Sequence, residues 1–305
     1  MRSTMLKNTT ILGLLSLGAL TAGCSHDATA NQPVASTSVE TPAVTTASLT
    51  TKPDPVSAPV DLATARSSWK SGVQLFDNGD YQGASKLLKT AVAGEPKDAY
   101  RQYLLGLALW KSGDRDAAEA ALVESGNLNP ASIKTWINLA RVRHDRGDRA
   151  GALEAAERAL TIDSSSADAL HQKGRALMEQ NRGDEALIAL TSSHELDPGN
   201  GYIANTLGLL LIQMGKPADA VSPLEAAKSA LPNVGYVRNN LAIAYERTGR
   251  MDEAKLEYLA AVDAGGAGGK AMKSLVRLGA TDTTGTTDST VSTETGVETA
   301  QAETH

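Results

Sequence analysis

Residues 201–228 read GYIANTLGLLLIQMGKPADAVSPLEAAK, and residues 235–262 read GYVRNNLAIAYERTGRMDEAKLEYLAAV. Both stretches open with Gly-Tyr, and the second begins 34 residues after the first. Each has a turn glycine at the same place, and this place recurs toward the N-terminus every 34 residues without insertion or deletion. Asn tolerates a positive φ better than most non-glycine residues, so we expect one Asn to form the same turn as five glycines. The turn residues are Gly79, Gly113, Gly147, Asn181, Gly215 and Gly249.

Small residues occupy three further places of this frame, where two helices of a pair would touch. All eighteen positions hold Gly, Ala or Ser, and proline closes four of the six units. Proline stops a helix because it lacks the backbone N–H and clashes with the preceding turn. The small residues are Gly72, Gly106, Ala140, Gly174, Gly208, Ala242, Ala84, Ala118, Ala152, Ala186, Ala220, Ala254, Ala91, Ser125, Ala159, Ser193, Ala227 and Ala261, and the prolines are Pro96, Pro130, Pro198 and Pro232.

This pattern resembles the tetratricopeptide repeat, a 34-residue antiparallel helix pair, over residues 65–268. Independently, Ala152, Ala155, Ala156, Ala159 and Leu160 form a stripe with helical spacing. The resemblance implies an all-α, right-handed α-solenoid of six tandem helix pairs with a concave groove. An amphipathic segment follows, and we expect residues 269–280 to form a capping helix.

The N-terminus has the pattern of a bacterial export signal. Residues 1–23 contain Arg2 and Lys7, then the apolar run 11–20, then small residues before the only cysteine. The ending LTAGC, residues 20–24, resembles the lipobox of bacterial lipoproteins, although Thr21 stands where an aliphatic residue is usual. The resemblance implies cleavage before Cys24 and lipidation of that cysteine; in a Gram-negative cell Ser25 then implies the periplasmic face of the outer membrane. The alternatives are a chance thiol and an uncleaved anchor, but ten apolar residues span only about 15 Å as a helix.

Two segments without apolar periodicity flank the repeats. Residues 24–62 are rich in Ser, Thr, Ala, Val and Pro, and we expect a disordered spacer there. Residues 281–305 contain no Lys or Arg, and we expect a disordered, solvated tail, with partner binding as the alternative. The acids of this tail are Asp282, Asp288, Glu294, Glu298 and Glu303.

Composition excludes several classes of protein. The net charge is -6 and no basic cluster is present, which argues against nucleic acid as a partner. One cysteine and five scattered histidines give no metal-binding spacing, and no cofactor motif occurs. His171 with Glu179, or His144 with Asp145, form conceivable acid–base pairs, but no nucleophile motif accompanies them. We therefore expect a protein that is not an enzyme.

In the repeat family, the first helix of each unit builds the concave wall. Carried over residue by residue, this wall pairs Tyr202 with Asn205 and Tyr236 with Asn239, and amide side chains on successive helices suit the backbone of an extended peptide. The other interpretation is ordinary surface. An aromatic set at the first two units forms either a partner-binding anchor or a cover for the open end. It consists of Trp69, Phe76, Tyr100, Tyr103 and Trp110.

The wall also carries basic residues. Arg141 and Arg175 either hold an acidic segment or pair with Asp145 and Glu179, four residues later on their own helices, and the pairing is the favoured interpretation. Arg247 lies on the same wall in the last unit. The Lys and Asn set with which some relatives clamp C-terminal carboxylates is not reproduced.

These observations predict a lipid-anchored scaffold that binds other envelope proteins or extended peptide segments. The lipobox, the spacer and the two quoted stretches are similar to the tetratricopeptide lipoproteins of the Tad (Flp) pilus assembly system, which implies a role in assembling or localising a secretin and its partners. The alternatives are an adaptor for peptidoglycan hydrolases or periplasmic proteases, and an enzyme. The oligomeric state stays open, because an uncovered repeat end can stack on a second copy.

Overall fold

A computed structural model describes residues 60–265 and 268–279, and every regular element in those ranges is an α-helix. The signal segment, Cys24, most of the spacer and the acidic tail lie outside the described residues. The helices are α1 (Leu62–Asp77), α2 (Tyr81–Gly94), α3 (Ala99–Lys111), α4 (Arg115–Leu128), α5 (Ile133–Asp145), α6 (Arg149–Ile162), α7 (Ala167–Glu179), α8 (Gly183–Leu196), α9 (Gly201–Gln213), α10 (Pro217–Ala230), α11 (Gly235–Arg247), α12 (Met251–Asp263) and α13 (Gly268–Arg277).

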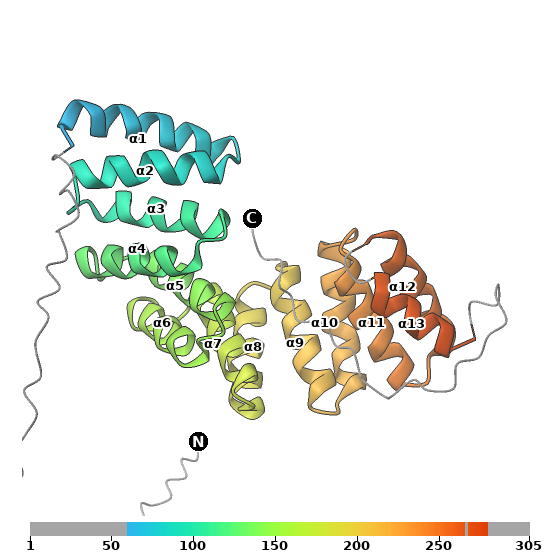
Figure 1. Ribbon diagram of the computed structural model, residues 1–305. Coiled ribbons are helices and arrows are strands. Elements are labelled where there is room, and N and C mark those ends of the chain that lie inside the picture. Colours follow the sequence, from blue (N-terminus) through green and yellow to red (C-terminus); the bar gives the residue numbers. More distant parts are fainter. Residues whose placement is uncertain (1–59, 266–267, 280–305) are drawn as a thin grey trace, which may run out of the picture. The chain divides into compact units, whose positions relative to one another are not determined.

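The helices form six hairpins followed by α13, as expected for a repeat array (Figure 1). Each odd-numbered helix from α1 to α11 is the first helix of a unit, and it packs against the even-numbered second helix that follows. Each second helix also packs on the first helix of the next unit. From α3 to α11, successive first helices contact one another as well, so they line a common wall. The prediction of an all-α repeat fold is confirmed.

A left-handed residue closes every hairpin. The five turn glycines have φ between 72° and 93°, and Asn181 has φ 59°, which confirms the prediction for this residue. In the first three units an aspartate follows the turn, and its side chain accepts a hydrogen bond from a backbone N–H three residues on. This caps the second helix by satisfying one of its free N–H groups. The sharp turn and the helix start are thus encoded together.

The small residues before the turns allow close helix contact. A Cβ placed on Gly208 would lie 2.4 Å from Leu224 Cγ, and the equivalent distance from Gly174 to Leu190 is also 2.4 Å. In the third unit the equivalent pair is Ala140 and Ala156, and both are buried. In this unit a larger residue on the first helix accompanies a smaller one on the second, which keeps the contact closely packed.

Two larger hydrophobic clusters run along the array. One covers the first three units and the other covers the last three together with α13. The capping helix packs Ala271 and Leu275 into the second cluster, while Arg277 Nη1 lies 2.7 Å from Glu246 Oε1 of α11. Within the described ranges, each helix is too short or too polar to cross a bilayer.

Candidate functional site

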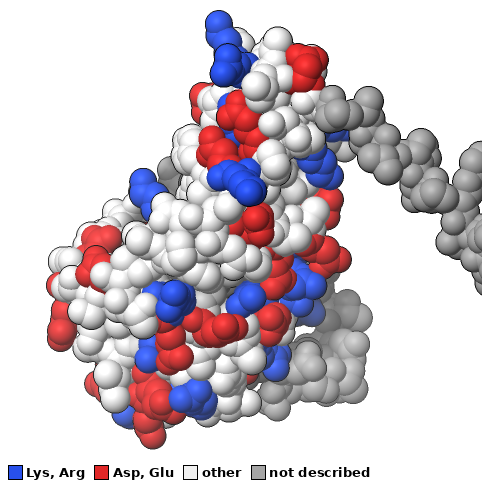
Figure 2. Space-filling view, turned by 90° about the vertical axis from the view of Figure 1, so that its left-hand side faces the viewer, with Lys and Arg blue, Asp and Glu red and all other residues white. Residues whose placement is uncertain are grey.

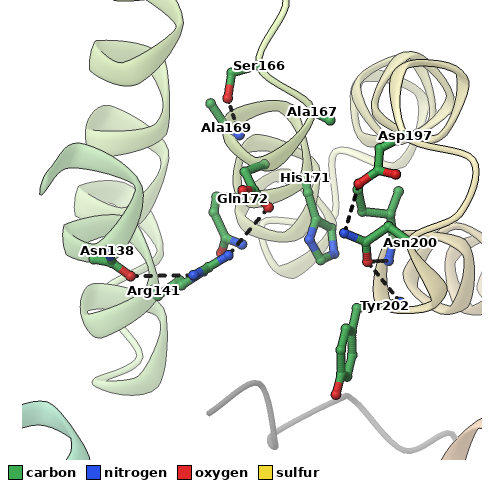
Figure 3. Close-up of polar contacts among 12 residues, drawn as sticks. Asn138, Arg141, Ser166, Ala167, Ala169, His171, Gln172, Asp197, Asn200 and Tyr202 are labelled. Atoms are coloured by element: carbon green, nitrogen blue, oxygen red, sulfur yellow. Dashed lines mark hydrogen bonds and ion pairs between the residues drawn. The ribbon is translucent and has the colours of Figure 1, made fainter. Parts of the chain in front are cut away.

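The wall of first helices carries a row of uncharged and basic polar side chains. They occupy the fifth, sixth and ninth places of their units, on α5, α7, α9 and α11. None is acidic, and most have little contact with solvent. Figure 3 shows part of this set, with side chains of α5, α7 and α9 gathered at the wall. We call the following nine residues the polar row: Asn138, Arg141, His171, Gln172, Arg175, Asn205, Thr206, Asn239 and Asn240.

Hydrogen bonds join the polar row from one unit to the next. Asn240 Nδ2 donates to Asn205 Oδ1 at 3.0 Å, and His171 Nε2 lies 2.9 Å from Thr206 Oγ1. Asn138 Nδ2 donates to Tyr103 Oη at 2.9 Å. Each pair is separated by 35 residues, one more than the repeat. The fifth residue of one first helix therefore meets the sixth residue of the next.

This pattern is interrupted in the middle of the array. The fifth place of the third unit holds Ile137, which has no acceptor, and Gln172 Nε2 has no hydrogen-bond partner among the described residues. Three further nitrogen atoms are buried and have no hydrogen-bond partner within the part of the chain that the structure covers: Asn205 Nδ2, Asn239 Nδ2 and Arg141 Nε. All four are donors, and Asn240 Oδ1 of the same row is a buried acceptor in the same state among the described residues. Leaving a buried donor unpaired costs about 1–3 kcal/mol, so each gains from a ligand that supplies an acceptor.

Arg141 of the polar row does not take the expected partner. Arg141 Nη2 lies 3.5 Å from Asp168 Oδ1 on the next first helix, and its Nη1 donates to Asn138 Oδ1 at 3.4 Å. The predicted pairing of Arg141 with Asp145 is therefore wrong. The long Arg side chain reaches across to α7 instead of along its own helix. Arg175 donates to Gln172 Oε1 at 3.2 Å, and its charge also acts on Glu179, the predicted partner.

Beside Arg175, a histidine bridges two acids. His144 Nε2 lies 2.9 Å from Glu179 Oε1, and His144 Nδ1 lies 3.5 Å from Asp145 Oδ1. Burial opposes protonation, but the hydrogen bonds to Asp145 and Glu179 outweigh it and raise the pKa of His144. Asp145 also accepts from Trp110 Nε1 at 2.7 Å, which fixes this anchor candidate in the array.

His171 has the opposite electrostatic character. Burial lowers the pKa of His171 well below its usual value, and the positive charges of Arg175 and Arg141 act in the same direction. The imidazole is therefore neutral at neutral pH. The guanidinium groups carry the positive charge at this part of the wall, and the acids that interact with them are Asp168, Asp145 and Glu179.

The remaining wall residues differ in how far they are buried. Tyr202 is half-buried, whereas Asn205, Tyr236 and Asn239 are buried. Tyr202 and Tyr236 belong to one small hydrophobic cluster, which is also lined by second-helix residues. Arg247 Nη1 donates to the backbone carbonyl of Ile212 at 3.1 Å, so it links the last two units.

The aromatic set divides into separate groups. Trp69 and Tyr100 make an edge contact at 5.8 Å, Tyr100 and Tyr103 stack at 6.2 Å, and Tyr100 is 61% exposed. Phe76 lies apart from these and contacts Tyr81 of α2 at 5.3 Å. The structure thus brings together Trp69, Tyr100 and Tyr103, and it places Phe76 and Trp110 elsewhere.

Sequence reasoning missed the sixth place of each first helix. Asn138, Gln172, Thr206 and Asn240 all lie there, next to predicted wall residues. For Asn138, Thr206 and Asn240 the signal is a polar residue 35 positions after a polar or aromatic fifth-place residue. Gln172 follows Ile137 at this offset and carries no such signal.

Other kinds of site find no support in the described ranges. There, no group of three or more His, Cys, Asp or Glu side chains is placed to hold a metal ion. On the face shown in Figure 2, acidic and basic side chains intermingle without a large area of one sign. Such a face is not the basic surface that nucleic-acid binding requires.

Comparisons with known proteins agree with the fold. Family models described as tetratricopeptide repeat match residues 75–142, 137–201 and 205–269, together more than half of the chain. No curated protein matches the sequence.

Among solved structures, PilF of Pseudomonas aeruginosa is 26% identical with a TM-score of 0.54, covering 61% of this chain and 84% of that chain. The APC/C Cut9–Hcn1 hetero-tetramer gives 13% identity and a TM-score of 0.63, covering 73% of this chain and 44% of that one. MamA of Desulfovibrio magneticus RS-1 gives 18% identity and a TM-score of 0.50, covering 55% of this chain and 96% of that chain. The last two likenesses concern the fold alone.

Proposed function

Because this chain belongs to the tetratricopeptide-repeat family, we propose that it is a protein–protein interaction scaffold that holds an extended segment of a partner along the polar row. The observation that carries the proposal is the set of buried, unpartnered donors on three first helices: Gln172 Nε2, Asn205 Nδ2 and Asn239 Nδ2. Carbonyl oxygens of an extended backbone are the acceptors that suit them.

Asn239 offers the cleanest test. Its Nδ2 has no partner among the described residues, so Asn239→Leu removes a donor without leaving another group unpaired. Such a replacement is neutral or stabilising for folding. By contrast, Asn205→Leu would leave Asn240 Nδ2 without its acceptor and confuse binding with stability.

The experiment is in-cell crosslinking of the tagged full-length protein, followed by purification and mass spectrometry. We expect Asn239→Leu to keep or raise the melting temperature and to lose the partners. Asn127→Leu, on the exposed face of α4, is the matched control and should keep them. Unchanged capture by Asn239→Leu would move the binding site away from the polar row, with the cluster of Trp69, Tyr100 and Tyr103 as the next candidate.

We also propose that the scaffold is anchored by lipid at Cys24, on the periplasmic face of the outer membrane in a Gram-negative cell. The lipobox-like segment LTAGC, residues 20–24, supports this proposal. Labelling with a palmitate analogue should mark the wild-type chain and not Cys24→Ala. Labelling of both would contradict the anchor at this residue.

A role in pilus assembly is the more specific candidate. The likeness to PilF and the similarity of the repeats to Tad (Flp) lipoproteins support it. Recovery of secretin and pilus-assembly proteins in a Cys24-dependent manner is the expected result. Recovery of peptidoglycan hydrolases or periplasmic proteases in the same crosslinking experiment would instead favour the alternative function, an adaptor for those enzymes.

A further inference from the structure

We propose that the acidic C-terminal tail, residues 281–305, occupies the polar row of its own chain and must be displaced before a partner binds. This inference rests on the proposed function of the polar row. It specifies the chemistry of the ligand, which is an extended acidic segment, and it adds a regulation that the repeat fold does not itself imply.

Charge complementarity is the first argument. The polar row carries Arg141 and Arg175 and no acid. The tail has five acids and no Lys or Arg. The acids of the same wall lie toward the ends of α5 and α7: Asp168 pairs with Arg141, and Asp145 and Glu179 feel the charge of Arg175. Between these ends, both guanidinium groups act on His171 with the same positive sign. An acidic strand is therefore attracted to the middle of the wall.

Hydrogen bonding is the second argument. Arg141 Nε, Gln172 Nε2 and Asn205 Nδ2 are unpartnered donors on three successive first helices. A segment that crosses α9, α7 and α5 passes all three. Its backbone carbonyls and its carboxylates supply acceptors, and carboxylates make stronger bonds with guanidinium donors than neutral acceptors do.

Reach is the third argument. Helix α13 ends at Arg277 and contacts α11, one end of the wall. The 26 residues from 280 to 305 can extend to about 85 Å at about 3.3 Å per residue. The distance from α11 to α5 is three helix-to-helix steps of about 10 Å each, or about 30 Å. The tail is long enough to lie along the whole polar row.

Attachment in cis makes even weak binding effective. A flexible tether holds its end at an effective concentration on the order of 1 mM. If the tail sequence binds the row with a Kd of about 100 µM, the tethered tail occupies the row in about nine chains of ten. A free peptide of the same sequence must displace it, so its apparent affinity for the full chain falls about tenfold.

The test uses a fluorescent peptide of residues 281–305 and two forms of the chain, the full chain and one with a stop codon after Ala280, which keeps every described helix. We expect the shortened chain to bind the peptide about tenfold more tightly than the full chain. Replacing the five acids of the peptide with Asn and Gln, or raising NaCl from 50 to 500 mM, should weaken binding at least tenfold. Arg141→Gln should do the same, whereas Arg182→Gln, which removes an exposed pair with Glu185, should not.

Site-specific photocrosslinking locates the tail in the full chain. With a benzoyl-phenylalanine at position 298, we expect crosslinks to α7 or α9 within one chain. Crosslinks between chains would replace the cis contact with a tail exchanged between copies, and equal binding by the full and shortened chains would overturn the proposal. If the shortened chain ignores the peptide while the full chain still captures partners through Asn239, only this inference fails.

Discussion

The contact between Gly208 and Leu224 predicts a non-additive pair of substitutions. A methyl group on residue 208 would lie 2.4 Å from Leu224 Cγ and 2.8 Å from Cδ2, whereas carbon atoms in contact are about 3.5–4.0 Å apart. Overpacking of this kind costs about 1–3 kcal/mol, and the better helix propensity of Ala returns about 1 kcal/mol. We expect Gly208→Ala to lower the free energy of unfolding by about 1 kcal/mol.

Leu224→Ala removes a fully buried side chain and should cost about 3 kcal/mol. In the double variant the new methyl group no longer meets the leucine, so the overpacking disappears and the propensity gain remains. The double variant should then lose about 2 kcal/mol of unfolding free energy, whereas the two single losses sum to about 4 kcal/mol; the difference is a coupling energy of about 2 kcal/mol. The third unit already carries this combination as Ala140 and Ala156, both buried.

Urea unfolding followed by far-ultraviolet circular dichroism measures these values, with the midpoints compared at an unchanged slope. Gly183→Ala is the control, because its nearest neighbour would be 3.7 Å from the added carbon and no loss is expected. If the double variant loses the sum of the two single losses within about 0.5 kcal/mol, the steric explanation of the small residues is refuted.

Three further outcomes follow from the described geometry. Asn181→Gly should raise the free energy of unfolding by about 0.5–1 kcal/mol in the same urea assay, because glycine adopts the φ of 59° without strain; a loss would contradict this reasoning. Gly235→Ala should destabilise the last unit by more than about 3 kcal/mol, since the new carbon would lie against the carbonyl oxygen of Gly265, and an unchanged thermal melt would be inconsistent with that contact. The pKa of His171 is lowered in the folded state, so His171 stabilises the fold above its unfolded pKa of about 6.5 and this contribution is lost as the pH falls; His171→Gln should therefore flatten the decline of Tm between pH 7.5 and 5. The pKa of His144 is raised in the folded state, so His144 stabilises the fold below about pH 6.5, and His144→Gln should steepen the same decline.

Much of the fold was predictable because each signal acts over a few residues. The turn at Asn181 needs a left-handed backbone, and the constant spacing identifies it without any knowledge of tertiary contacts. The small residues report a steric limit between two helices of one hairpin. The capping helix follows from a short amphipathic pattern. These features depend on local geometry repeated six times.

The candidate site was less predictable because it depends on contacts between units. The fifth-place residues could be found by carrying over the family pattern, but the importance of Thr206 and Asn240 follows only from the offset of 35 residues between partners. The partner of Arg141 was predicted wrongly because an i to i+4 acid and an acid on the adjacent helix are both within reach of a long side chain. Choosing between them requires the distance between α5 and α7.

The offset bonds along the wall also limit how the units can be rearranged. A Tyr–Asn pair joins units two and three, a His–Thr pair joins four and five, and an Asn–Asn pair joins five and six. Each seam thus has its own chemistry, although the helix hairpins share one shape. A permuted chain in which the fifth unit follows the second would set Tyr103 against Thr206 and leave Asn138 without its hydroxyl partner. Duplication or deletion of whole units therefore conserves the backbone but not the seams, and the order of the units is part of the information that the sequence encodes.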